Sequence, residues 1–262
     1  MAQRERLSEI RQTVKRNKKV LVSQLSKEYG VTEETIRRDL EKLEQEGLIT
    51  RTHGGAVLNM YHVSEHIEYL RRAQTNKDEK QTIGRLTAEI IPTGVSLGVD
   101  SSSTGMEAIS LLRDRRDITV LTNSVKIVRE LDQAALTVIS TGGVINNNTF
   151  SMQGSIARNT INEYYLDYVL ISCTGMSLDG GIFDSNEEEA AIKRVLIQRG
   201  QKIILMVDHT KFDKYAFVRV LGFDQLEAVV TDRKPDDEWL ELFEEKGIDL
   251  YYPMEEERKT ED

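Results

Sequence analysis

Residues 32–43 read TEETIRRDLEKL, and this stretch decides how the first 60 residues fold. Ile36, Leu40 and Leu43 recur in it at spacings of four and three residues. This periodicity predicts an amphipathic helix that buries the three apolar side chains on one face. We expect the helix to run from Glu33 to Glu46.

The predicted helix has a clear start and stop, and its outer face is polar. Thr32 is a typical N-cap residue, and Gly47 supplies a C-terminal stop. An arginine near the start of such a helix can present two donors to guanine O6 and N7, or contact phosphates. The residues left facing outward are Glu34, Thr35, Arg37, Arg38, Glu41 and Lys42.

Two further helices precede this one. The apolar spacing predicts one helix over residues 4–15 and another over residues 22–29. Gly30 lacks a Cβ atom and therefore permits the sharp turn into the third helix. Helices joined by a tight glycine turn are typical of a helix-turn-helix, whose last helix enters the major groove of DNA.

The residues after the third helix predict a wing. Residues 48–52 and 53–57 have the pattern of two short strands about a glycine turn, so the module resembles a winged helix. Arg51 on this wing could reach a phosphate or the minor groove. The simpler alternative is a helical bundle with a solvated charged face. The residues expected to bind double-stranded DNA are Thr32, Glu34, Thr35, Arg37, Arg38, Lys42, Arg51, His53 and Gly54.

Composition and charge agree with a two-part protein. The chain has 262 residues and a formal net charge of −9, a length that suggests one or two globular domains. Residues 1–60 carry 12 Lys+Arg and 9 Asp+Glu, a charge of +3, so the remainder carries −12. A basic head on an acidic body is typical of a DNA-binding module joined to a separate domain.

The sequence also favours a cytoplasmic location. Its longest all-apolar run, Ile203–Val207, is far shorter than the about 20 residues of a membrane helix. Residues 1–10 are charged where a secretory signal would be apolar. A single cysteine, Cys173, cannot form an intramolecular disulfide. We therefore expect no membrane segment.

Residues 58–75 have mixed charge and weak periodicity, which predicts a linker. Within them His62 and His66 form an H-x-x-E-H pattern that would place two zinc ligands on one face of a helix. Catalytic zinc needs a third protein ligand, and His53 and His209 lie elsewhere in the sequence. Only an acidic side chain could complete such a site, so we predict no metal and interpret the segment as a polar helix or loop.

Residues 76–252 alternate helical patterns with short β-rich runs, which is typical of an α/β domain with a largely parallel sheet. The predicted strands are 95–99, 118–121, 136–139, 168–173, 203–207 and 228–230. The predicted helices are 80–90, 105–113, 125–131, 157–164 and 187–199. Residues 253–262 form a charged tail with no apolar anchor.

Ligands of parallel sheets bind outside the carboxyl ends of the strands. Hydroxyl groups and glycines follow several predicted strands, often at a helix N-terminus that favours an anion, although any single loop could be only a helix cap. Because several strand ends carry such residues, they together predict a pocket for a phosphorylated polyol. We expect the phosphate at residues 100–104, with Lys193 and Lys211 supplying charge. The predicted ligand-binding residues are Asp100, Ser101, Ser102, Ser103, Thr104, Thr122, Asn123, Gly142, Gly143, Lys193, Asp208 and Lys211.

These stretches together resemble the DeoR family of bacterial transcriptional regulators. In the first module the likeness rests on residues 6–14, 32–40 and 51–56; in the second it rests on residues 100–104, 122–124, 142–143, 189–193, 208–211 and 231–232. The resemblance implies a sensor domain similar to ribose-5-phosphate isomerase and a sugar-phosphate effector. The family's first loop usually reads Asp-Ser-Gly-Thr-Thr, whereas Ser102 and Ser103 replace its glycine and first threonine here.

Two functions follow from these observations. The leading one is a repressor of a carbohydrate-catabolism operon, released from its DNA operator by a phosphorylated sugar. Helix-turn-helix proteins commonly dimerise to read two half-sites, so we expect a homo-oligomer, either a dimer or a tetramer. The alternative is a sugar-phosphate isomerase or deaminase with an accessory DNA-binding module, for which Asp100 and Asp208 are available general bases. We predict no enzymatic activity and no cofactor.

Overall fold

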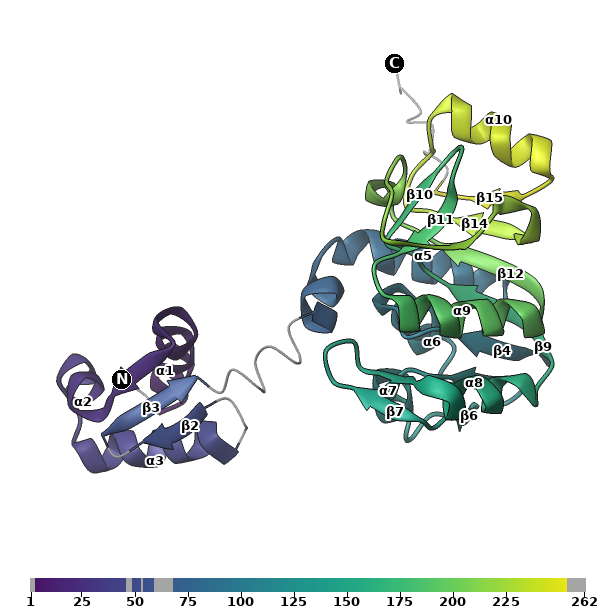
Figure 1. Ribbon diagram of the computed structural model, residues 1–262. Helices are drawn as coiled ribbons and strands as arrows, with labels where there is room; N and C mark the ends of the chain where they lie inside the picture. Colours follow the sequence, from purple (N-terminus) through teal and green to yellow (C-terminus); the bar gives the residue numbers. More distant parts are fainter. Residues whose placement is uncertain (1–2, 46–48, 53, 59–67, 254–262) are drawn as a thin grey trace, which may run out of the picture. The chain divides into compact units, whose positions relative to one another are not determined.

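The computed structural model describes residues 3–45, 49–52, 54–58 and 68–253 (Figure 1). The chain divides into two compact units, Met1–Glu68 and Tyr69–Asp262. Each unit has a hydrophobic core of its own. Most of the predicted tail, residues 254–262, lies outside the described residues.

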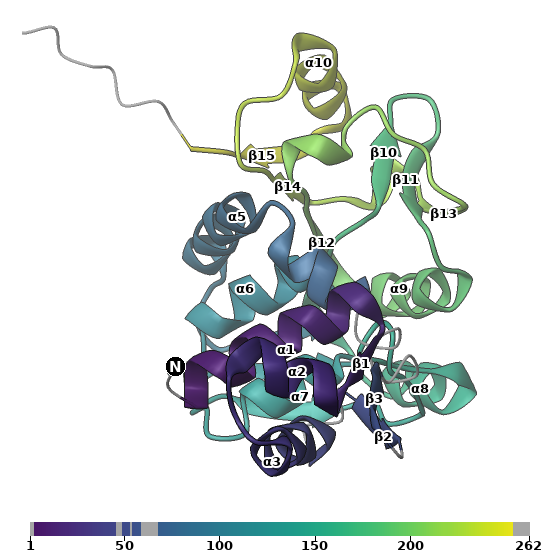
Figure 2. The ribbon, with the colours of Figure 1, turned by 90° about the vertical axis from the view of Figure 1, so that its left-hand side faces the viewer.

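Unit 1 combines helices with a small antiparallel sheet, which confirms the predicted winged helix (Figure 2). β3 is the central strand of this sheet and pairs with both β1 and β2. β1 is not predicted from the sequence, because three residues are too few for a periodic pattern. The described elements of unit 1 are α1 (Gln3–Asn17), β1 (Lys19–Leu21), α2 (Val22–Tyr29), α3 (Glu33–Gln45), β2 (Ile49–Thr52) and β3 (Gly55–Leu58). The predicted helix stop at Gly47, and His53 of the wing, lie outside the described residues.

The turn between α2 and α3 has the predicted chemistry. Gly30 ends α2 with a φ of 63°, a left-handed conformation that favours glycine. Thr32 caps α3, because its Oγ1 accepts the Thr35 backbone N–H at 3.3 Å. The turn and cap together fix the direction in which α3 leaves α2.

The core of unit 1 forms along the buried side of α3. Ile36, Leu40 and Leu43 are each at most 1% exposed, which confirms the predicted stripe. Beside them Asp39 Oδ2 accepts a hydrogen bond from Arg6 Nε at 2.6 Å, and both side chains are buried. α1 is therefore held to α3 by a buried ion pair as well as by apolar contact.

Unit 2 is built on a parallel sheet whose strand order is β15-β14-β12-β9-β4-β5-β6. The order reverses between β4 and β9: the chain builds outward from β4 to β6 on one side and from β9 to β15 on the other. All six predicted strands are confirmed, and β15 is the additional one. The strands are β4 (Ser96–Val99), β5 (Thr119–Thr122), β6 (Thr137–Ser140), β9 (Leu166–Ile171), β12 (Gly200–Met206), β14 (Ala228–Val230) and β15 (Asp249–Tyr251).

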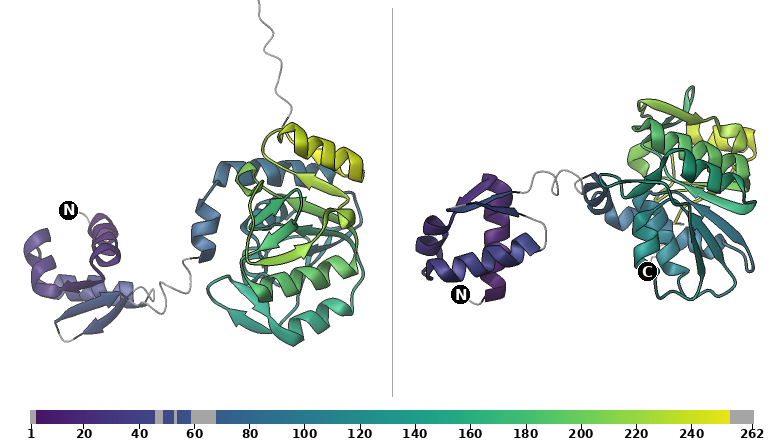
Figure 3. Two further views of the ribbon diagram at one scale, coloured as in Figure 1. Left: turned by 45° about the horizontal axis from the view of Figure 1, so that its top comes forward. Right: turned by 60° about the horizontal axis from the view of Figure 1, so that its bottom comes forward.

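Helices cover both faces of this sheet (Figure 3). Alternate residues of β9 show the two faces, because Val169 and Ile171 pack in one apolar cluster and Leu170 packs in the other. The first cluster includes side chains of α8 (Gly154–Asn162), α9 (Glu187–Arg199) and α10 (Asp237–Lys246). The second includes side chains of α5 (Lys77–Ile90), α6 (Ser103–Leu111) and α7 (Val125–Glu130). The predicted α/β class is confirmed.

Smaller elements that the sequence pattern does not predict complete unit 2. One is an antiparallel sheet of order β10-β11-β13 and another is the hairpin β7–β8. Each of these strands has only three or four residues, so none shows a recognisable alternation of apolar and polar residues. Their bounds are β7 (Val144–Asn146), β8 (Ser151–Gln153), β10 (Gly175–Ser177), β11 (Gly181–Asp184) and β13 (Val218–Leu221).

The beginning of unit 2 differs from the predicted linker of residues 58–75. Residues 69–74 are helical, and Tyr69 is 2% exposed. The Tyr69 ring lies edge-on to the Phe150 ring, with centroids 5.5 Å apart. The Tyr69 backbone N–H donates to the Asn148 carbonyl at 3.1 Å. Residues 69–75 are thus part of unit 2, whereas residues 59–67, with His62 and His66, lie outside the described residues.

Within the part of the chain that the structure describes, no helix is long and apolar enough to span a membrane.

The buried Arg6–Asp39 pair yields the first prediction. Replacing Asp39 with Asn leaves the Arg6 charge buried without its partner carboxylate, which costs about 3–5 kcal/mol. Hydrogen–deuterium exchange on the full chain should therefore accelerate throughout residues 3–58 and stay unchanged in residues 96–251. Glu41→Gln, an exposed change on the same helix, is the control and should leave exchange as it is. Equal exchange in both variants would contradict the pair's role.

Candidate functional site

The ligand site predicted in unit 2 lies where the sheet reverses its strand order. β4 and β9 are neighbours there, and their carboxyl ends reach the same edge of the sheet. Such a reversal is the usual ligand position in open α/β sheets, because the chain leaves the two strands in opposite directions and opens a crevice.

Asp100 ties these two strand ends together. Its Oδ1 accepts the Ser102 backbone N–H and its Oδ2 accepts the Ser172 backbone N–H, each at 3.0 Å. Ser172 directly follows β9, so one carboxylate bridges the loops after both central strands. Asp100 is 1% exposed and requires a positive charge nearby.

Lys193 of α9 supplies that charge. Its Nζ lies 2.5 Å from Asp184 Oδ2 and 3.2 Å from Asp100 Oδ2. Burial alone would lower the Lys193 pKa, but Asp184, Asp100 and Glu189 outweigh burial and raise it above its ordinary value. Burial likewise opposes the Asp184 charge, whereas Lys193 holds the Asp184 pKa below its usual range. Lys193 is thus charged and already shared between two carboxylates.

Next to this pair lies a group of hydrogen-bond acceptors. Glu189 is buried, and its two carboxylate oxygens accept the Ser101 hydroxyl at 3.0 and 3.2 Å. The Gln153 amide donates to Glu189 Oε1 at 3.3 Å. Asn123 is buried as well, and its Oδ1 has no hydrogen-bond partner among the described residues. This end of the site can accept hydrogen bonds from ligand hydroxyl groups.

The loop at residues 100–104 leads into α6, as predicted, but its first two hydroxyls are engaged. Ser101 donates to Glu189, and Ser102 Oγ accepts the Gly105 N–H at 2.9 Å as the N-cap of α6. The first helical N–H groups, those of Ser103 and Thr104, have no partner within the helix. An anion at this loop would therefore be bound by backbone N–H groups rather than by the Ser101 and Ser102 side chains.

A second end of the site is cationic and follows β12. Asp208 Oδ1 accepts the Thr210 N–H at 3.1 Å and the Asn76 amide at 3.0 Å. Lys80 of α5 is buried, and its Nζ donates to the backbone carbonyls of Arg72 and Thr75. Burial lowers the Lys80 pKa to about 8, which Asp208 opposes and the charges of Lys211 and Arg72 reinforce.

Arg72 stands out in this cationic end. Its Nε and Nη2 are buried and have no hydrogen-bond partner among the described residues. Its Cζ lies 5.8 Å from the centroid of the Tyr69 ring, which packs beside it. Neither Arg72 nor Lys80 is among the predicted site residues, because Arg72 falls in the predicted linker and Lys80 reads as an ordinary helical lysine. The sequence did contain a signal, because both cations lie within one stretch of nine residues, 72–80, ahead of β4.

Three other predicted residues have structural contacts. Thr122 Oγ1 donates to the Val99 carbonyl at 2.7 Å and so stabilises the carboxyl end of β4. Gly142 and Gly143 follow β6 with φ of 63° and 111°. A Cβ on Gly143 would lie 2.6 Å from the Gln153 carbonyl oxygen, so glycine permits this close approach. These contacts shape the loops beside the site, and a ligand contact of the three residues stays a prediction.

Cys173 is a buried free cysteine. Burial raises the Cys173 pKa to about 12, so its thiol is not activated as a nucleophile. No group of three or more His, Cys, Asp and Glu side chains within the described ranges could hold a metal ion. The candidate zinc pair His62 and His66 lies outside those ranges.

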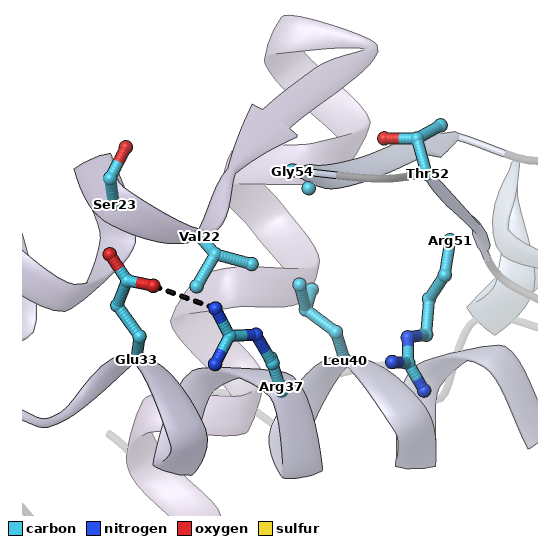
Figure 4. A pocket seen from close by; sticks show the side chains of 9 residues that line it. Val22, Ser23, Glu33, Arg37, Leu40, Arg51, Thr52 and Gly54 are labelled. Atoms are coloured by element: carbon cyan, nitrogen blue, oxygen red, sulfur yellow. Dashed lines mark hydrogen bonds and ion pairs between the residues drawn. The ribbon is translucent and has the colours of Figure 1, made fainter.

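In unit 1 the predicted DNA-binding residues lie on α3 and the wing. Arg37, Arg38 and Lys42 are exposed, as is Gly54 at the turn of the wing. A cleft of about 320 Å³ separates α3 from the wing and is lined on its two sides by Arg37 and Arg51 (Figure 4). The cleft thus presents two cationic side chains, together with the carboxylate of Glu33.

A winged helix-turn-helix followed by an α/β unit with a buried polar site defines a DNA-binding regulator with a sensor domain. The family models agree: residues 6–61 match the DeoR-like helix-turn-helix domain and residues 75–233 match the DeoR C terminal sensor domain. The chain belongs to the DeoR family and is a DNA-binding transcriptional regulator.

Its relatives extend over nearly the whole chain. The HTH-type transcriptional regulator YulB of Bacillus subtilis (strain 168) is 35% identical, covering 93% of this chain and 94% of the relative. The transcriptional repressor GlcR of the same organism is 31% identical over 99% and 100%. The glycerol-3-phosphate regulon repressor of Escherichia coli (strain K12) is 29% identical over 95% and 99%.

Among solved structures, ribose 5-phosphate isomerase A from Methanocaldococcus jannaschii is similar with a TM-score of 0.41 and 12% identity. The match covers 53% of this chain and 55% of that chain. At this TM-score the likeness is partial.

The buried lysine of the site gives the second prediction. Lys193→Met should destabilise unit 2 by about 3–5 kcal/mol, because Asp100 and Asp184 would remain buried without their cation. Adding Asp184→Asn should recover at least about 1 kcal/mol of that loss in a double-mutant cycle followed by denaturant unfolding. Lys202→Met removes the half-exposed pair with Glu227 and should cost less than about 1 kcal/mol. Equal losses at the two lysines would show that the Lys193 pair is not coupled as described.

Proposed function

We propose that this regulator is a repressor of a carbohydrate operon and that a phosphorylated sugar releases it from its operator. The names of two relatives, the glycerol-3-phosphate regulon repressor and GlcR, support this class of target. The proposal also rests on the chemistry of the site in unit 2, which combines a cationic end with an end rich in hydrogen-bond acceptors.

The observation that carries the proposal is the unpartnered guanidinium of Arg72. Two of its nitrogens are buried without a hydrogen-bond partner among the described residues, an arrangement that is costly unless an anion completes it. Lys80 and Lys211 are close enough that Lys211 and Arg72 both depress the Lys80 pKa. The three cations Lys80, Lys211 and Arg72 outnumber the two carboxylates that act on Lys80, those of Asp208 and Glu107, and this excess of positive charge suits a phosphate dianion.

We propose that the phosphate also reaches the free N–H groups of Ser103 and Thr104 at the start of α6. Ser103 and Thr104 are buried, so a bound anion there would be shielded from water and strongly held. We propose that Lys211 binds the phosphate, as expected from the sequence, and that Lys193 instead holds the frame of the site, because two carboxylates already neutralise it.

The sugar hydroxyls would then extend toward Glu189 and Asn123. A carboxylate and an amide oxygen can accept hydrogen bonds from hydroxyls of defined stereochemistry. The unpartnered Asn123 Oδ1 supports this orientation, because a buried acceptor is left unsatisfied until a donor arrives.

Binding without turnover is the chemistry that these contacts favour. Asp100 accepts two N–H groups and faces Lys193, and Glu189 accepts from Ser101 and Gln153. A general base needs a carboxylate free to take a proton from the substrate. We therefore infer a sensor rather than an isomerase or deaminase. Incubation with pentose and hexosamine phosphates should return them unchanged.

Release from DNA requires the ligand to favour one arrangement of the chain over another. Residues 69–74 are the first helical residues of unit 2, and Arg72 would bind the ligand from within them. Shifting a repressor from mostly bound to mostly free needs a differential affinity of up to about 10⁴-fold. We propose that the contacts of Arg72 supply part of that difference, in a cytoplasmic homo-oligomer that presents two DNA-reading units.

The third prediction tests the cationic end. A panel of sugar phosphates, including glycerol 3-phosphate and glucose 6-phosphate, is titrated into a complex of the full chain with a duplex that it has selected from a random pool. Lys211→Ala should bind that duplex normally but require about tenfold to hundredfold more ligand for release, because one charge-assisted contact is lost.

Lys214→Ala is the matched control for this titration, since Lys214 is exposed and lies three residues further along. It should behave as the unmodified protein does. Release by a neutral sugar as readily as by its phosphate would contradict the proposed effector class.

The fourth prediction concerns pH. With a pKa of about 8, Lys80 loses its positive charge as the pH rises from 7 to 9, so affinity for an anion falls over this interval. The ligand itself does not change, because the second pKa of a phosphate monoester is about 6. Calorimetry should show binding about tenfold weaker at pH 9 than at pH 7.

Lys80→Gln removes the titrating group while retaining a donor for the two backbone carbonyls. This variant should bind weakly at both pH values. A drop of the same size in Lys80→Gln would assign the pH dependence to another group.

A further inference from the structure

The outer face of α3 carries arginines whose charges are already paired. Arg37 Nη2 donates to Glu33 Oε2 at 2.8 Å, and its Nη1 lies 3.8 Å from Glu34 Oε2. Arg38 Nε lies 3.5 Å from Glu34 Oε1. On the wing, the Arg51 backbone N–H donates to Glu44 at 2.9 Å. A helix that must approach polyanionic DNA thus places carboxylates beside its cations.

The simplest reading is that Glu33 and Glu34 stabilise α3. They lie in its first turn, where the helix dipole favours negative charge, and Glu33 forms an i,i+4 pair with Arg37. Such exposed pairs contribute about 0.3–0.5 kcal/mol each. The same turn, however, is the part of a recognition helix that meets the base edges. A carboxylate there approaches phosphates of like charge, which opposes binding to DNA.

The geometry of the cleft shows what Glu33 does to Arg37. Glu33 and Arg37 lie on the wall formed by α3, and their side chains meet across one helical turn (Figure 4). The contact occupies Nη2 and favours one orientation of the guanidinium on its long side chain. Of the remaining donors, Nη1 has only a long contact with Glu34, so one edge of the fork stays available for a ligand.

We propose that Glu33 is a positioning residue that sets the sequence selectivity of this regulator through Arg37. The guanidinium in this favoured orientation presents its remaining donors to the two acceptors of a guanine edge, O6 and N7. At a site without these acceptors Arg37 gains no base contact, and the Glu33 carboxylate stays close to phosphates with no compensating contact. Glu33 therefore weakens binding to unrelated DNA more than binding to the operator. This inference concerns unit 1 and does not depend on the identity of the effector.

Selection from a random duplex pool tests the proposal with the full-length chain. The unmodified protein, Glu33→Gln and Arg37→Ala each select their preferred sequences, and affinity is then measured for the selected duplex and a shuffled one at the same salt concentration. Glu33→Gln should bind the shuffled duplex about threefold to tenfold more tightly and reduce the ratio of the two affinities at least fivefold. It should also weaken the guanine preference at the position where Arg37→Ala weakens it.

Glu41→Gln is the matched control. It removes the same charge from an exposed position of the same helix, and Glu41 has no ion pair within the described residues. Its affinity ratio should stay within twofold of the unmodified protein. Glu33→Asp keeps the charge but shortens the side chain, so it should keep weak binding to shuffled DNA while losing the guanine preference.

Two outcomes would overturn the proposal. If Glu33→Gln selects the same sequence with the same affinity ratio, Glu33 does not position Arg37. If Glu33→Gln weakens binding to every duplex by one common factor, its role is confined to the stability of α3. Circular dichroism of each variant separates the second outcome from a loss of folded protein.

Discussion

The bridge made by Asp100 is the contact on which the sensor unit depends. The sheet reverses its order between β4 and β9, and one carboxylate accepts N–H groups from the loops after both strands. A buried carboxylate must be neutralised, so Lys193 has to reach it from α9. Lys193 also binds Asp184 at the end of β11. Asp100 thereby joins the main sheet, a covering helix and the small antiparallel sheet in one network.

The same network divides the site by charge. At one end, two carboxylates neutralise Lys193, and the groups that can still bind a ligand are the hydrogen-bond acceptors of Glu189 and Asn123. At the other end, the three cations Lys80, Lys211 and Arg72 outnumber the two nearby carboxylates of Asp208 and Glu107, so positive charge is in excess. The net charge of −12 outside residues 1–60 is therefore no obstacle to an anion site. Charges beyond about 8–10 Å are largely screened at physiological salt, and only the nearby cations are felt.

Much of this architecture could be predicted from the sequence because it rests on local signals. The spacing of Ile36, Leu40 and Leu43, the cap at Thr32 and the turn at Gly30 are short-range features, and all three are confirmed. The strands that lead to the site are also predicted, since buried parallel strands form continuous apolar runs.

What could not be predicted depends on contacts between distant residues. The pairing of Ser101 with Glu189 spans 88 positions, and that of Ser172 with Asp100 spans 72. No local pattern shows that these partners meet. Arg72 was missed for the same reason: its segment has weak periodicity, and only the packing of Tyr69 on Phe150 makes residues 69–74 part of the sensor. A strand as short as β1 exists through its partner β3 and not through its own propensity.

Both units hold their cations beside carboxylates, but at different depths. On α3 the partners are about half exposed, with side-chain exposures of 49% for both Arg37 and Glu33. Such pairs contribute less than about 1 kcal/mol, so a base edge or phosphate can compete with them. In the sensor, Lys193 and its partners are at most 5% exposed, and separating them would leave buried charges without a counter-ion. The exposed Arg37–Glu33 pair can therefore exchange its contacts with DNA. The buried ion pairs of Lys193 stay intact and hold the loops of the sensor in place. Among the described residues, buried side-chain atoms without a hydrogen-bond partner remain on Arg72, Asn123, Thr87 and Thr231. The ligand that we propose would satisfy those of Arg72 at one end of the site and Asn123 at the other.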